Sequence, residues 1–338
     1  MSKIEWTDTT WNPVTGCTKI SPGCAHCYAE RMAKRLAGRY GYPADEPFRV
    51  TLHPDRLEQP LHFRGPRMIF VCSMGDLFHV DVPFDFIDRV FAVMALCPQH
   101  IFQVLTKRPE RMAEYLNRFS LRTLRSRWAQ TIEEQWPERG AATAYGLREH
   151  GAEPLPNVWL GTSIENQKAA DERIPHLLGC PAAVRFLSAE PLLGPIFIDE
   201  FHFYDEYEEC LTCGTAQYAI KEAPVCGCET DPDMAEIEGT ALANWKHKTE
   251  QLLHWLILGG ESGPGARPCD VQWISDLLDQ CAAAGVPAFV KQLGAHVIDS
   301  ADEEFGPDFR IPLKSAKGGD PAEWPERLRV RQWPEVKP

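Results

Sequence analysis

The chain has 338 residues, 44% of them hydrophobic and 25% charged, and its formal net charge is −13. This composition is typical of a globular protein and excludes disordered and fibrous classes, while the acidic balance argues against non-specific coating of nucleic acid. No apolar run reaches the ~18 residues of a membrane span, and the first residues lack a signal-peptide pattern. We therefore expect a soluble cytoplasmic protein without a membrane partner.

Short apolar runs alternate with helical patterns along the chain, and each run is continuous, as in strands buried on both faces of a parallel sheet. The predicted strands are Met68–Met74, Ile101–Leu105, Val158–Gly161, Val184–Leu187, Trp255–Leu258 and Ala288–Lys291. The clearest helices are Phe84–Leu96, with Pro83 near its start, and Val271–Ala284, with Asp270 as a cap and Gly285 after its end. This alternation predicts an α/β fold with a parallel sheet, open or closed.

Polar segments follow five of the predicted strands where each strand ends. These segments are Gly75–Phe78, Thr106–Pro109, Thr162–Asn166, Ser188–Pro191 and Gly259–Gly263. The carboxyl ends of parallel strands lie at one edge of a sheet, where α/β folds bind their ligands. The five segments therefore predict one shared pocket rather than five separate solvated loops.

Residues 199–239 differ from the rest of the chain in charge. From Asp199 to Glu238 there are twelve acidic residues and one basic residue, Lys221, so the remainder is nearly neutral and is compatible with a polyanionic substrate. We predict an acidic insertion at 199–239 within an α/β body formed by residues 1–198 and 240–338. Its cysteines have the spacing C-x2-C-x12-C-x-C, which is typical of a structural zinc knuckle, with an auxiliary iron–sulfur cluster or no metal as alternatives. These cysteines are Cys210, Cys213, Cys226 and Cys228.

Twelve cysteines are unusual for a cytoplasmic chain, in which clustered cysteines are more often metal ligands or catalytic groups than disulfides. Cys17, Cys24 and Cys27 form a C-x6-C-x2-C group without a nearby fourth cysteine, and we expect His26 to point away from a shared metal. Three thiolates with one open position favour a [4Fe–4S] cluster, with a zinc site completed by a distant ligand as the alternative. The remaining five are predicted to be buried in the core: Cys72, Cys97, Cys180, Cys269 and Cys281.

The motifs N-P-x-x-G-C and G-C-x-x-C-Y-A, within residues 12–29, resemble the cluster loop of radical S-adenosylmethionine enzymes, closest to the spore photoproduct lyase branch. E-W-T-D-x-T-W-N-P, M-G-D-L-F, T-K-R-P, S-A-E-P-L-L-G and G-G-E-S-G resemble a phage- and bacterium-encoded, radical-SAM-like family of unassigned function, from residue 5 to about residue 333. The C-x6-C-x2-C spacing departs from the superfamily's commonest C-x3-C-x2-C. The resemblance implies a partial (β/α) TIM-type barrel with parallel strands, plus the small Cys-rich insertion.

The resemblance also implies the cofactors. Cys17, Cys24 and Cys27 would hold three irons of a [4Fe–4S] cluster, and S-adenosylmethionine would chelate the fourth. An electron from a reductant such as flavodoxin or ferredoxin would cleave a carbon–sulfur bond, releasing methionine and a 5′-deoxyadenosyl radical that abstracts hydrogen from the substrate. The implied contacts with S-adenosylmethionine or the substrate come from Asp76 (methionine ammonium), Lys107 (methionine carboxylate), Ser163 or Glu165 (ribose), Glu190 and Glu261 (ribose or substrate), and the backbone around His26 and Tyr28 (adenine).

The likeness to spore photoproduct lyase favours nucleic acid or a nucleotide derivative as substrate. Two other functions remain open. The first is a non-catalytic, phage-type metal-binding protein with structural zinc sites. The second is a DNA-binding accessory protein that uses a basic helix after the cluster loop, carrying Arg31, Lys34, Arg35 and Arg39. Cys72 has core packing as its expected role and hydrogen-atom donation as the alternative, and residues 314–333 are expected to form an irregular tail over the body.

Overall fold

The computed structural model describes residues 4–149, 153–210, 216–218, 245–301 and 309–335. The chain forms two compact units, one made of Met1–Phe197 with His254–Pro338 and the other of Ile198–Leu253. Within the described ranges, no helix combines the length and the apolar character that crossing a membrane requires.

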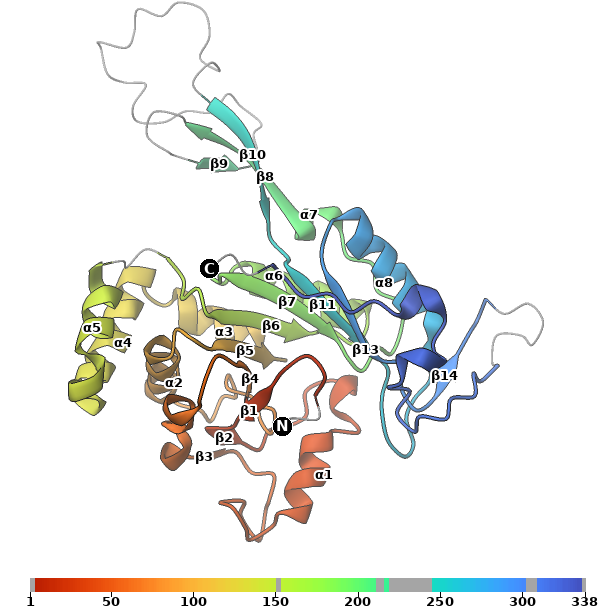
Figure 1. The fold of residues 1–338 in the computed structure, drawn as a ribbon, viewed down its shortest axis with the longest axis horizontal. Coiled ribbons are helices and arrows are strands. Elements are labelled where there is room, and N and C mark those ends of the chain that lie inside the picture. Colours follow the sequence, from red (N-terminus) through yellow and green to blue (C-terminus); the bar gives the residue numbers. More distant parts are fainter. Residues whose placement is uncertain (1–3, 150–152, 211–215, 219–244, 302–308, 336–338) are drawn as a thin grey trace, which may run out of the picture. The chain divides into compact units, whose positions relative to one another are not determined.

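A seven-stranded sheet lies at the centre of the first unit, and every neighbouring pair of its strands is parallel (Figure 1). Its order is β1 (Thr9–Trp11), β4 (Met68–Val71), β5 (Ile101–Thr106), β6 (Val158–Ser163), β7 (Val184–Ala189), β11 (Trp255–Gly259) and β13 (Ala288–Gln292). All six predicted strands are present, so the predicted α/β class with a parallel sheet is confirmed. The predicted end of the first strand at Met74 was wrong, because Cys72 adopts a left-handed φ of 58° that breaks the extended chain after Val71.

Helices alternate with these strands. They are α1 (Tyr28–Arg35), α2 (Phe84–Leu96), α3 (Pro109–Asn117), α4 (Leu121–Gln135), α5 (Pro137–Glu149), α6 (Gln167–Leu178) and α8 (Val271–Ala283). The predicted helices at α2 and α8 are confirmed, including the cap, since the Asp270 carboxylate accepts the backbone N–H of Gln272 at 2.9 Å. The basic helix is shorter than expected, because α1 ends at Arg35 and the left-handed Gly38 precedes Arg39.

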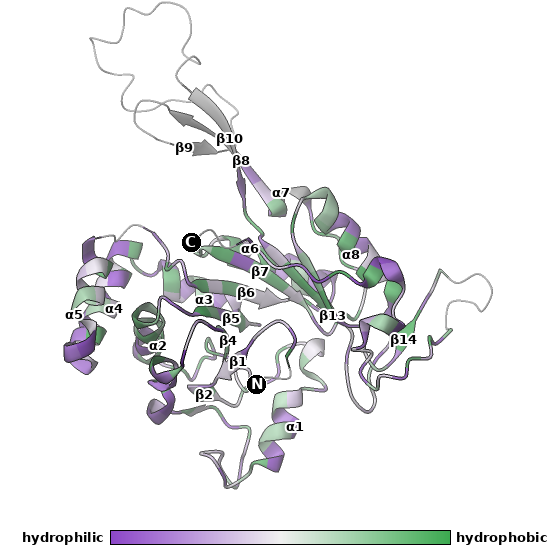
Figure 2. Cartoon of the chain, in the orientation of Figure 1, coloured by the Kyte–Doolittle hydropathy of each residue, from purple (hydrophilic) through white to green (hydrophobic). Residues whose placement is uncertain are grey.

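The sheet is curled, and Trp6 shows how strongly. Neighbouring strands lie ~4.8 Å apart, and three strands separate β4 from β11 in the sheet order. Even so, the centroid of the Trp6 ring lies 4.7 Å from the ring centroid of Phe70 on β4 and 6.2 Å from that of Trp255 on β11. Trp159, Phe186 and Phe289 complete this aromatic cluster on the concave face. Figure 2 shows hydrophobic residues along parts of the central strands, such as β5 and β7.

Short elements attach the loops to this body. β2 (Val14–Thr15) pairs with β3 (Thr51–Leu52), and β12 (Cys269–Asp270) pairs with β14 (Val297–Ile298). The C-terminal segment is irregular and packs on the body, as predicted. The Val330 carbonyl of this segment accepts the N–H of Val290 in β13 at 2.8 Å, and the Trp324 side chain of the segment is buried.

The second unit contains α7 (Glu200–Phe203) and a small antiparallel sheet with the order β10 (Trp245–Gln251), β8 (Tyr204–Cys210) and β9 (Ala216–Tyr218). It extends beyond residue 239, where composition placed the end of the insertion, because β10 pairs along the whole of β8. Cys210 is the last residue of β8. The other three predicted zinc ligands, Cys213, Cys226 and Cys228, lie outside the described residues.

Candidate cofactor-binding site

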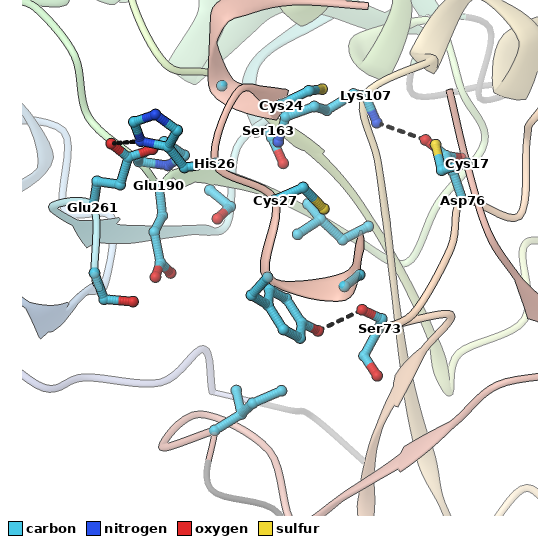
Figure 3. A pocket seen from close by; sticks show the side chains of 18 of the residues that line it. Cys17, Cys24, His26, Cys27, Ser73, Asp76, Lys107, Ser163, Glu190 and Glu261 are labelled. Atoms are coloured by element: carbon cyan, nitrogen blue, oxygen red, sulfur yellow. Dashed lines mark hydrogen bonds and ion pairs between the residues drawn. The ribbon is translucent and has the colours of Figure 1, made fainter. Parts of the chain in front are cut away.

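A cavity of about 450 Å³ lies where the sheet strands end at their carboxyl termini. Its lining includes the three grouped cysteines and all of the residues predicted to contact S-adenosylmethionine or the substrate, with one exception (Figure 3). These are Cys17, Cys24, His26, Cys27, Tyr28, Asp76, Lys107, Ser163, Glu190 and Glu261. The exception, Glu165, is 1% exposed and lies against the backbone of the cysteine loop.

Gly16 fixes the start of the cysteine loop, which we define as residues 16–27. It follows β2, and its N–H donates to the Met74 carbonyl at 2.9 Å, which places Cys17 beside the end of β4. Gly16 has a φ of +82°, and a Cβ there would lie 2.2 Å from the Arg49 carbonyl oxygen. Only glycine fits this position, because both the left-handed backbone and the neighbouring chain exclude a side chain.

Gly16→Ala is therefore expected to lower the free energy of unfolding by more than about 3 kcal/mol, since it combines backbone strain with an overlap that backbone movement must relieve. Urea denaturation measures this loss. Gly65→Ala is the matched control: Gly65 also has a positive φ, +71°, but no heavy atom of the described residues beyond its chain neighbours lies within 4 Å of where a Cβ would be. A control loss of about 1 kcal/mol fits this account, and equal losses for the two variants contradict it.

The other two cysteines follow on short helical turns. Cys24 ends the 3-10 turn Pro22–Cys24, and Cys27 directly precedes α1. All three thiols are free and partly exposed. Among the described residues, no three His, Cys, Asp or Glu side chains converge as ligands of a single metal ion. A cluster does not require such convergence, because each thiolate binds a different iron.

Charged groups act differently on two of these thiols. Burial, reinforced by the Asp76 carboxylate, raises the pKa of the Cys17 thiol to about 11, although Arg108 opposes this rise. Burial also disfavours the Cys24 thiolate, but hydrogen bonds from the Ile20 backbone and Ser21 and the nearby Lys107 charge overcome it and lower the pKa of Cys24. Cys24 thus lies in the more favourable surroundings for a thiolate ligand.

Four strand ends each carry a carboxylate paired with a cation. The pairs are Asp76 with Arg108 at 3.2 Å, Glu165 with Arg173 at 2.8 Å, Glu190 with Lys291 at 2.7 Å, and Glu261 with Arg267 at 2.6 Å. Sequence reasoning found the four carboxylates and placed Arg108 in the pocket segment Thr106–Pro109, but it missed the other three cations. Lys291, as the polar residue near the end of a predicted apolar strand, carried a recognisable signal. No sequence signal marked Arg173 or Arg267, because only the folded structure brings them to their carboxylate partners.

Three of these pairs contact the cysteine loop, and the Asp76–Arg108 pair does so through Cys17 and Thr18. Glu165 accepts the Gly23 N–H at 3.4 Å, and Glu261 bonds to His26 Nδ1 at 3.0 Å, the contact drawn in Figure 3. Arg267 adds a bond from Nη1 to the Pro22 carbonyl at 2.9 Å. The loop is therefore anchored to the ends of β6 and β11.

The ionisation of Glu261 predicts a pH dependence of stability. Burial disfavours its charge, but hydrogen bonds from Arg267 and His26 overcome that cost and lower the pKa of Glu261 from 4.5 to about 2. Below pH 4.5 the carboxylate of Glu261 is therefore protonated in the unfolded chain but stays ionised in the folded chain. The free energy of unfolding consequently falls as the pH drops towards 2. At neutral pH, Glu261→Gln should lose about 3 kcal/mol of unfolding free energy, and this deficit should shrink on acidification. Urea titrations at several pH values measure it, and a deficit independent of pH contradicts the assignment.

The remaining candidates differ in their surroundings. The backbone N–H of Lys107 donates to Asp76 at 3.2 Å, while its ammonium makes no hydrogen bond or ion pair with the described parts of the chain. The Tyr28 hydroxyl donates to the Ser73 carbonyl. Cys72 is buried and also lines the cavity. The four other scattered cysteines are buried as well, which confirms their predicted burial.

Comparison with known proteins gives one match. No curated protein and no solved structure matches the chain. A family model with the description "Protein of unknown function (DUF5131)" matches residues 1–325, which is nearly the whole chain and includes every residue of the cavity. The chain therefore belongs to the DUF5131 family.

Proposed function

We propose that this protein is a radical S-adenosylmethionine enzyme whose [4Fe–4S] cluster is held by Cys17, Cys24 and Cys27. The observation that carries the proposal is the placement of three free thiols of one loop on a cavity at the carboxyl ends of parallel strands. The donor set fits the cluster, because three thiolates leave one iron open to another ligand. When bound, cluster and S-adenosylmethionine supply reductive cleavage of a carbon–sulfur bond and a 5′-deoxyadenosyl radical.

The chain's own residues bind and orient the cofactor in this proposal. The ammonium of Lys107, which makes no hydrogen bond or ion pair within the described residues, binds the methionine carboxylate. Asp76, which accepts from Phe78, Thr106, Lys107 and Arg108, binds the methionine ammonium in exchange for one of these bonds. The carboxylates of Glu165 and Glu261 bond directly to the cysteine loop, at Gly23 and His26, which supports a role in holding this loop rather than direct contact with the ribose. Ser163 and the Glu190–Lys291 pair then remain for the ribose or the substrate.

The fold supports the same proposal. The curled sheet of seven parallel strands is compatible with a partial (β/α) barrel. The cavity lining also includes the Trp6 and Phe70 rings and two lysines, Lys291, which pairs with Glu190 at 2.7 Å, and Lys317, which pairs with Glu5 at 2.6 Å. Aromatic rings beside cations suit a substrate that is a nucleic acid or a nucleotide derivative.

Metal analysis of protein reconstituted without oxygen tests the proposal. We expect about four irons and four sulfides per chain and, after reduction, an EPR signal that changes when S-adenosylmethionine is added. Zinc without iron at the first cysteine group would overturn the proposal in favour of a structural metal site. The same analysis tests the second group, where we propose one structural zinc at Cys210, Cys213, Cys226 and Cys228.

A further inference from the structure

The guanidinium of Arg108 joins the first cysteine to the nearest carboxylate. Its Nη1 donates to Cys17 Sγ at 3.3 Å and to Asp76 Oδ2 at 3.2 Å. Its Nη2 donates to the carbonyl and to the hydroxyl oxygen of Thr18, both at 2.9 Å. The side chain of Arg108 is only 13% exposed. This half-buried cation is thus fixed by four contacts, one of them to a sulfur atom.

The other two cysteines lack such a partner. Cys24 Sγ lies 3.7 Å from the Ser21 hydroxyl, and no arginine donates to Cys24 or Cys27 in the described part of the chain. Asp76 opposes Arg108 at Cys17, because its carboxylate carries the opposite charge and lies 3.2 Å from the same Nη1 that donates to the sulfur. Cys17 is therefore the thiol at which a cation and a carboxylate compete.

This arrangement matters for electron transfer to a cluster. Reduction adds one electron and hence one negative charge, and donors to the ligand sulfurs stabilise that charge. A hydrogen bond from a cationic donor is stronger than one from a neutral donor, and low exposure limits its screening by water. Arg108 should make reduction easier, and Asp76 should make it harder.

We propose that Arg108 is a positioning residue that sets the reduction potential of the cluster through its hydrogen bond to Cys17. This inference rests on the proposed function, because it requires a cluster bound at Cys17. The proposal predicts that Arg108 raises the reduction potential and that Asp76 lowers it. A purely structural role of this ion pair would not predict opposite shifts.

The test is a redox titration of the reconstituted full-length protein, with dithionite as the one-electron donor and the EPR signal of the reduced cluster as readout. Arg108→Gln should lower the equilibrium constant for reduction about tenfold, which is about 59 mV for one electron. Asp76→Asn should shift the potential upward, and Arg108→Lys, which keeps the charge without the planar fork, should lie between wild type and Arg108→Gln.

Arg111→Gln is the matched control. Arg111 lies in α3, the helix that Arg108 directly precedes; it donates to the Val80 and Val82 carbonyls and packs over the Phe84 ring, so its loss should leave the potential unchanged. If Arg108→Gln does not load a cluster, Arg108→Lys and Asp76→Asn still decide the question. Potentials equal to wild type in the loaded Arg108 and Asp76 variants overturn this inference alone. Absence of a cluster from the wild type overturns the proposed function, and this inference with it.

Discussion

Cys24→Ala is expected to abolish cluster binding while leaving the fold intact. Loss of a partner that only orients a metal ligand costs 10–100-fold in affinity, so loss of a ligand should cost more than about 100-fold. Cys24 is partly exposed, and it ends a short 3-10 turn without packing in the core. Iron content and visible absorbance after reconstitution measure the loss, and circular dichroism checks the fold.

Cys281→Ala is the control for this experiment. Cys281 is buried in α8, and it does not line the cavity. Its replacement should lower stability by about 1 kcal/mol and leave the iron content unchanged. Equal iron loss in both variants would mean that instability, rather than loss of a ligand, explains the result for Cys24.

Arg173→Met is expected to lower the free energy of unfolding by about 3–5 kcal/mol, because it removes the ion-pair partner of the buried Glu165 carboxylate. Arg173 Nη1 donates to Glu165 at 2.8 Å and to the Ser163 carbonyl at 2.7 Å, and the two side chains are 8% and 1% exposed. Since Glu165 also bonds to Gly23, the variant should bind iron less tightly as well.

Two further variants separate the causes of this loss. The double variant Glu165→Gln/Arg173→Met should recover part of the stability, since no unpaired charge remains buried. Lys168→Met removes a cation from the same helix, but its pair with Glu172 is exposed, so its cost should stay below about 1 kcal/mol. Urea denaturation compares the three proteins, and equal costs for Lys168→Met and Arg173→Met would contradict a specific role for the buried pair.

The sheet was largely predictable from sequence, because parallel strands buried on both faces leave continuous apolar runs that local reading detects. β1 was missed because Thr9–Trp11 is short and mostly polar at its start. The early end of β4 was missed because the left-handed turn falls on Cys72, a residue type that does not signal such a turn.

The carboxylates of the site were predictable as polar residues at strand ends, whereas their surroundings were not. Glu165 and Glu261 were expected to contact S-adenosylmethionine or the substrate, but the structure pairs them with arginines and with the cysteine loop. Arg267 reaches Pro22 across most of the chain length, and a contact of this kind leaves no local pattern. The spacing of the cysteines thus indicated the three thiols, whereas only the fold showed which residues hold the cysteine loop.

The most direct measurement is the formation of 5′-deoxyadenosine by reconstituted, reduced protein supplied with S-adenosylmethionine in the absence of oxygen. The account predicts 5′-deoxyadenosine and methionine in equal amounts from the wild type, and neither product from the variants with Ala at Cys17, Cys24 or Cys27. A wild-type protein that takes up zinc and no iron at these cysteines, and forms neither product, would contradict it.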